Sequence, residues 1–123
     1  MNLGVILGGL TRQMYSNLTT GIVYSDIESL HNMLNNSENS GFGLTSDCTA
    51  GLRRKIEGTV NKYINSGDAS VKRGGLNQLL YVVDRHLPKI RAYYGKCSYS
   101  EATSALITCL EAQKVAMEGA LRI

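Results

Sequence analysis

Two histidines and three cysteines are the residues of this sequence best suited to nucleophilic or metal chemistry near neutral pH. His31 and His86 are the only side chains whose ordinary pKa lies close to neutrality. A catalytic pair would need His86 within hydrogen-bond reach of Cys97 or Cys109, with a third group orienting the ring. Nothing in the spacing of these residues supports that geometry. The sequence therefore favours His86 as a partly buried structural residue.

The third cysteine, Cys48, shares no short spacing with Cys97 or Cys109, and an odd number of cysteines does not suit a disulfide framework. A zinc site would need paired ligands that this sequence does not offer. We expect reduced thiols without metal, with Cys48 and Cys109 acting as small apolar core residues. Phosphate-binding loops, dinucleotide fingerprints and hydrolase motifs are absent from the sequence, and the acidic residues are scattered. These observations predict a protein that is not an enzyme and uses no cofactor.

The charges of this sequence are strongly segregated. Residues 53–96 hold ten basic and three acidic residues, whereas the rest of the chain holds three basic and seven acidic residues, for a net charge of +3 overall. Cations spread along a surface suit backbone phosphates, and aromatic side chains among them suit bases or sugars. The sequence thus predicts a nucleic-acid-binding face made of Arg53, Arg54, Lys55, Lys62, Lys72, Arg73, Arg85, Lys89, Arg91, Tyr93, Tyr94 and Lys96.

A simpler interpretation of the same basic region is a set of solvated helix faces that keep the protein soluble. A helix-turn-helix over residues 53–91 is a further possibility, but the expected link over residues 66–75 is longer than the usual three or four residues.

Hydrophobic periodicity predicts the elements that would position these residues. Apolar residues recur every three or four positions through most of the chain, and the sequence contains a single proline. We therefore predict an all-α protein, one domain over residues 1–123, folded as a bundle of about five helices. The expected helices cover residues 3–22, 25–36, 45–67, 76–95 and 98–121, with Pro88 inside the fourth and a loop over residues 35–46.

One short string resembles a known family. Residues 66–71, Ser-Gly-Asp-Ala-Ser-Val, with Leu76 and Asn77 after them, resemble a short stretch of phycobiliprotein β subunits. The likeness covers one turn, and Cys48 lacks the Cys-x-Arg-Asp context of a chromophore site. It implies no function or cofactor for this chain.

Two functions remain open at this point. The first is a small cytoplasmic protein that binds DNA or RNA through backbone phosphates, for which a homodimer or another homo-oligomer would be a natural form. The second is a helical interaction or assembly protein, such as a subunit of a viral or phage particle or a small protein inhibitor, because segregated charges also suit contacts between copies of the chain. The apolar run over residues 1–10 is too short to cross a bilayer and has no basic flank, so no membrane role is expected.

Overall fold

Residues 24–39, 46–96 and 101–122 are described by the computed structural model, and this part of the chain is helical without any strand. Its four helices are α2 (Ser25–Asn39), α3 (Ser46–Ile64), α4 (Ala69–Lys96) and α5 (Glu101–Leu121). The prediction of an all-α bundle is confirmed. The helix expected over residues 3–22 lies outside the described residues, as do the loop at 40–45 and the link at 97–100.

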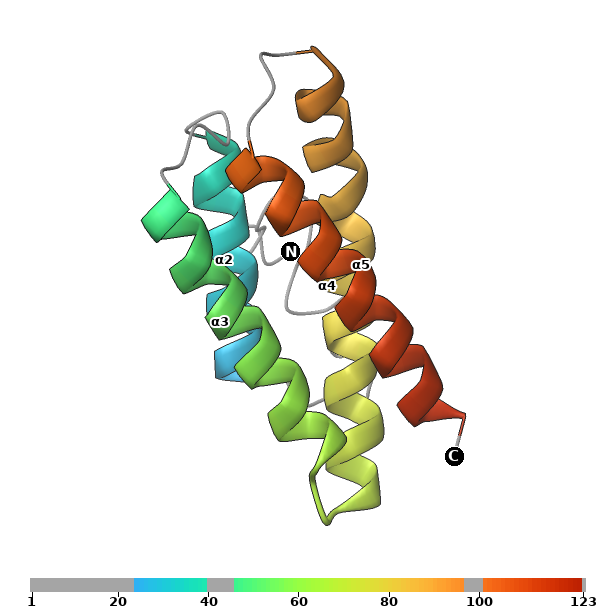
Figure 1. Ribbon diagram of the computed structural model, residues 1–123. Coiled ribbons are helices and arrows are strands. Elements are labelled where there is room, and N and C mark those ends of the chain that lie inside the picture. The colour runs from blue at the N-terminus through green and yellow to red at the C-terminus, as the bar shows by residue number, and fades with distance from the viewer. Residues whose placement is uncertain (1–23, 40–45, 97–100, 123) are drawn as a thin grey trace, which may run out of the picture.

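The helices pack as one compact bundle around a shared core. α3 and α4 run side by side in opposite directions, and α5 lies over both of them, as Figure 1 shows. α2 packs against α4 and α3. Because α3 and α4 form an antiparallel hairpin, they are not arranged as the two crossed helices of a helix-turn-helix. Among the described helices, none is both long and apolar enough to span a membrane.

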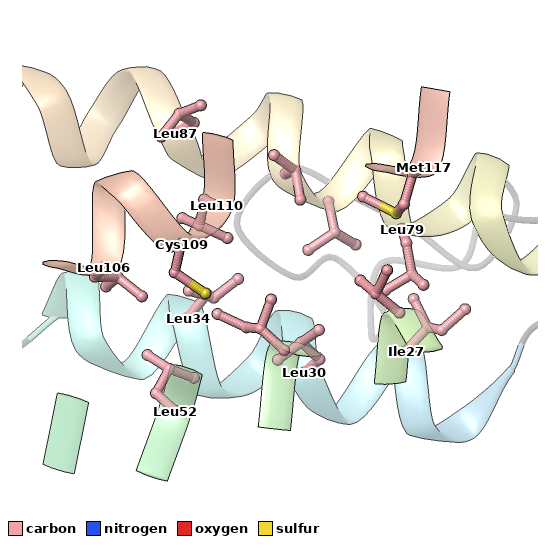
Figure 2. Close-up of a cluster of buried hydrophobic side chains, with 14 of the residues drawn as sticks. Ile27, Leu30, Leu34, Leu52, Leu79, Leu87, Leu106, Cys109, Leu110 and Met117 are labelled. Carbon is pink, nitrogen blue, oxygen red and sulfur yellow. The ribbon is translucent and has the colours of Figure 1, made fainter. Parts of the chain in front are cut away.

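The core is formed by the apolar stripe of each helix. Leucines of α2, α3, α4 and α5 converge with Cys109 and Met117 in its centre (Figure 2). Full burial of one such side chain stabilises the folded state by about 1.5–3 kcal/mol, so this cluster is the main source of stability. The buried apolar residues are Ile27, Leu30, Leu34, Leu52, Ile56, Val60, Tyr63, Leu76, Leu79, Val82, Val83, Leu87, Ile90, Leu106, Cys109, Leu110 and Met117.

Helix α2 is longer than its sequence indicates. The carbonyl of Tyr24 accepts hydrogen bonds from the N–H groups of Ile27 and Glu28, so the helix begins immediately after Tyr24. It continues to Asn39, whereas the sequence predicted fraying at residues 35–36. The spacing of the apolar residues predicts an inner face made of Ile27, Leu30, Met33 and Leu34. Met33 is instead 36% exposed, and His31 is fully buried. His31 follows Ile27 by four residues and therefore lies on the same helix face.

The link between α3 and α4 is shorter than predicted. Asp68 caps α4, since its carboxylate accepts hydrogen bonds from the N–H groups of Ser70 and Val71. The Gly74-Gly75 step was expected in a turn but lies inside α4. A Cβ atom at Gly75 would stand 2.1 Å from the Tyr63 ring, so only glycine lets α4 approach α3 this closely.

Pro88 lies inside α4, and the helix continues on both sides of it. This confirms the prediction of one helix instead of two. Proline has no N–H to donate to the carbonyl four residues earlier, so one backbone hydrogen bond is lost at this point. The exposed position of Pro88 leaves that carbonyl on the outside of the bundle.

Candidate functional site

Basic residues of α3 gather on one side of the bundle. Arg54, Lys55 and Lys62 are exposed and lie along an open depression that also includes Gly58, Thr59 and Asp26. We call this depression the α3 groove. Arg54 and Lys62 are eight residues apart, which corresponds to about 12 Å along the helix axis. Three of the twelve predicted residues are therefore brought together.

One acidic side chain, Asp26 of α2, enters the α3 groove. Lys62 Nζ donates to Asp26 Oδ2 at 2.7 Å, and the Tyr63 hydroxyl donates to Asp26 Oδ1 at 2.7 Å. Burial alone would raise the pKa of Asp26. The hydrogen bonds from Lys62 and Tyr63, the charge of Lys62 and the N–H of Ile27 outweigh that effect and hold the pKa below its ordinary value.

The same contact fixes Tyr63 between α2, α3 and α4. Its ring lies 5.3 Å from the ring of Tyr24 and packs onto Gly75, and Lys62 lies over its face. Burial, followed by the hydrogen bond to Asp26 and its negative charge, raises the pKa of Tyr63 far above the ordinary value. Tyr63 therefore stays protonated and donates to Asp26 at all physiological pH values.

The basic residues of α4 do not extend the α3 groove. Lys72 and Arg73 line a separate depression with the end of α5, and Arg85 lines another beside Tyr81. Arg91 donates to Glu111 of α5 at 2.5 Å. Exposed pairs of this kind contribute about 0–1 kcal/mol, so Arg91 could exchange its partner at little cost.

Two more predicted residues, Arg53 and Lys89, are half-buried, and the side chains of Tyr93, Tyr94 and Lys96 lie outside the described part. The Nε of Arg53 is buried and has no hydrogen-bond partner among the described residues. The described basic residues thus divide into separate groups on α3 and α4.

The two histidines contact each other in the core. His31 of α2 and His86 of α4 are both fully buried, and His86 Nε2 lies 2.6 Å from His31 Nδ1. Burial, followed by the charges of His31, Lys89 and Arg85, lowers the pKa of His86 to about 3. The sequence predicted a partly buried structural histidine at position 86 and did not predict this pairing. The available signal was that both histidines lie on the apolar stripes of their helices.

Cys109 offers no activated nucleophile. Burial, followed by the negative charge of Glu57, raises the pKa of its thiol to about 11, although Arg53 acts in the opposite direction. Thiolate is the reactive form, so Cys109 is inert near neutral pH. His86 is paired with His31, which leaves no support for a Cys-His catalytic pair. Within the described residues, Cys109 is a free thiol and no cluster of three potential metal ligands exists.

Comparison with known proteins adds no further assignment. No family model matches this chain, and neither the curated proteins nor the solved structures contain a significant match.

Proposed function

We propose that the protein binds nucleic acid through backbone phosphates, with the α3 groove as the principal contact. The observation that carries this proposal is the alignment of Arg54, Lys55 and Lys62 along one exposed helix face. A length of about 12 Å corresponds to three or four nucleotide steps at about 3.4 Å per step. The described part of the chain provides no ion-pair partner for Arg54 or Lys55, so both are available to phosphates.

Asp26 sets the strength of this contact. Lys62 shares its charge with Asp26, so a phosphate at this end of the groove competes with a carboxylate 2.7 Å from the ammonium. Affinity therefore depends mainly on Arg54 and Lys55, and moderate affinity without sequence preference is expected. Lys72, Arg73, Arg85 and Lys89 would add contacts only to a polymer that bends around the bundle.

The test measures binding to a labelled DNA or RNA duplex over a range of salt concentrations. Replacing Arg54 and Lys55 together with alanine should make the slope of log K against log salt shallower by about two, because each phosphate contact contributes about −0.9. This variant keeps the Lys62–Asp26 pair, so the fold should be unaffected. The matched control is Lys114→Ala with Arg122→Ala, which removes the same charge from α5 and the turn that follows it and should change the slope little. Absence of salt-dependent binding, or equal effects of the two double variants, would refute the proposal.

A second function, assembly through α5, has a specific observation in its favour. Val115 is 67% exposed, the exposed Ala116 follows it directly, and the exposed Ala112 and the half-buried Gly119 lie one helical turn from it. Such a surface with small side chains allows two helices to approach closely. Under this proposal, light scattering would show an oligomer that Val115→Glu dissociates while Arg54→Ala with Lys55→Ala does not. A monomer at high protein concentration would exclude it.

A further inference from the structure

The buried histidine pair joins two helices that are far apart in the chain. His31 lies in the middle of α2, His86 lies in α4, and 55 residues separate them. Both imidazoles are 0% exposed, and their rings lie 4.6 Å apart with a tilt of 50°. The contact between His86 Nε2 and His31 Nδ1 therefore joins α2 directly to α4 inside the core, and the packing of α2 depends on the protonation state of these rings.

The geometry also fixes where the protons lie. A separation of 2.6 Å between His86 Nε2 and His31 Nδ1 leaves room for a single proton between the two nitrogens. His86 Nδ1 is buried and has no hydrogen-bond partner among the described residues. A bare nitrogen lone pair there costs less than a buried N–H without an acceptor, so the neutral pair has His86 Nε2–H donating to His31 Nδ1.

The buried His31–His86 pair has no favourable position for an additional proton. A proton on His86 Nδ1 would place a charged N–H in a buried site without an acceptor. The groups whose positive charge opposes a charge on His86 are Lys89 and Arg85 of its own helix and, when it is protonated, His31 of α2; no carboxylate among the described residues offsets their effect on His86. A second proton between the rings would direct two N–H groups at each other. The packed state therefore requires a neutral pair.

We propose that the His31–His86 pair is an acid-sensitive latch that holds α2 against α4 at neutral pH and releases α2 when the pH falls towards 5. Released histidines are exposed to water and regain a pKa of about 6.5, so protons favour the open state. Between pH 8 and pH 5, the opening equilibrium should increase about 30-fold for each histidine that stays neutral when packed. If both histidines stay neutral when packed, the opening equilibrium should increase about 1,000-fold over the same pH range.

The composition of the chain makes this effect easy to isolate. The sequence contains only these two histidines, so no other side chain has an ordinary pKa between 5 and 6.5. Proton uptake on opening within this interval therefore reports on the latch alone. Carboxylates titrate at lower pH and contribute separately.

The experiment is amide hydrogen exchange of the full chain at pH 5 to 8, corrected for the intrinsic exchange rate at each pH. Amides of α2 should lose protection as the pH falls, with a 30-fold to 1,000-fold larger opening constant at pH 5, while α3, α4 and α5 keep theirs. Simultaneous loss of protection in all four helices would overturn the latch. Unchanged protection of α2 at pH 5 would do the same.

The control variant is His31→Asn with His86→Gln. The asparagine side-chain oxygen can occupy the position of His31 Nδ1 and accept, and the glutamine amide nitrogen lies near the position of His86 Nε2 and can donate, so the two side chains can still form a hydrogen bond without titrating. In this variant the opening of α2 should not depend on pH between 5 and 6.5. A retained pH dependence would overturn the proposal. Should the variant fail to fold, ¹⁵N NMR of the wild-type imidazoles decides: rings that stay neutral in the folded protein at pH 5 support the latch, and rings that become charged without release of α2 refute it.

Discussion

Replacement of Gly75 by alanine should destabilise the protein through a single clash. The added Cβ would lie 2.1 Å from Tyr63 Cδ1, 2.5 Å from Cε1 and 2.6 Å from Cγ. These atoms belong to a buried ring whose hydroxyl is held by Asp26, so the ring cannot move without losing that bond. Overpacking of this kind costs about 1–3 kcal/mol, and a hydrogen bond to a charged group contributes about 1.5–3 kcal/mol.

The substitution also has a favourable part, because alanine is about 1 kcal/mol better than glycine inside a helix. The expected net loss in the free energy of unfolding is therefore about 1.5–5 kcal/mol, which urea denaturation can measure. Gly58→Ala is the matched control. Gly58 also lies inside a helix, and a Cβ there meets nothing within 4 Å, so this change should stabilise the protein by about 0.5–1 kcal/mol.

The same substitution in a protein without the Tyr63 ring separates the clash with that ring from other causes of destabilisation. In a Tyr63→Leu protein the Asp26 bond is already lost and the ring is absent, so Gly75→Ala should cost far less than in the wild type. An equal cost in both backgrounds would refute the assignment of the effect to the Tyr63 ring. Equal stability of Gly75→Ala and the wild type would refute the close approach of α3 and α4.

Two further predictions concern titrating groups. The pKa of Asp26 is lowered in the folded protein, so its contribution to stability is present above its unfolded pKa of about 3.9 and is lost as the pH falls through the folded value. Asp26→Asn should therefore lower stability at pH 7 and weaken its pH dependence below pH 4 in urea titrations; an unchanged acid dependence would contradict this. Cys109 should resist alkylation at pH 7.5 in the native state and react in denaturant, as peptide mass spectrometry can show, because its pKa is raised to about 11. Rapid native labelling would contradict its burial.

The sequence predicts the helical class because periodic apolar positions report directly on burial. At 100° per residue the sequence places Leu52, Ile56, Val60 and Tyr63 on one face of α3, and all four are buried. Contacts between helices cannot be predicted in this way. In the sequence, Asp26 resembles a residue at the start of a helix, and Lys62 resembles a residue on a solvent-exposed helix face. In the structure their side chains form an ion pair although 36 positions separate them.

Glycine positions show a second limit of prediction from sequence. The Gly74-Gly75 step was expected in a turn because glycine weakens an isolated helix. Packing against the Tyr63 ring gives Gly75 a role inside α4 that only the three-dimensional structure reveals. The same holds for the basic residues, whose positions in the sequence are clustered although α3 and α4 present them to separate depressions.

The separations along the chain have a consequence for the order of folding. The ion pair between α4 and α5 spans 20 residues, whereas the contacts of α2 and the preceding Tyr24 with α4, at His31–His86 and Tyr24–Gln78, span 55 and 54 residues. Closing a longer loop loses more chain entropy, and local contacts form sooner. The α3–α4 hairpin, closed by a four-residue turn, is the natural nucleus, and α2 joins late. Because α2 docks after the transition state of folding, substitutions that weaken its contacts should increase the unfolding rate and leave the folding rate nearly constant.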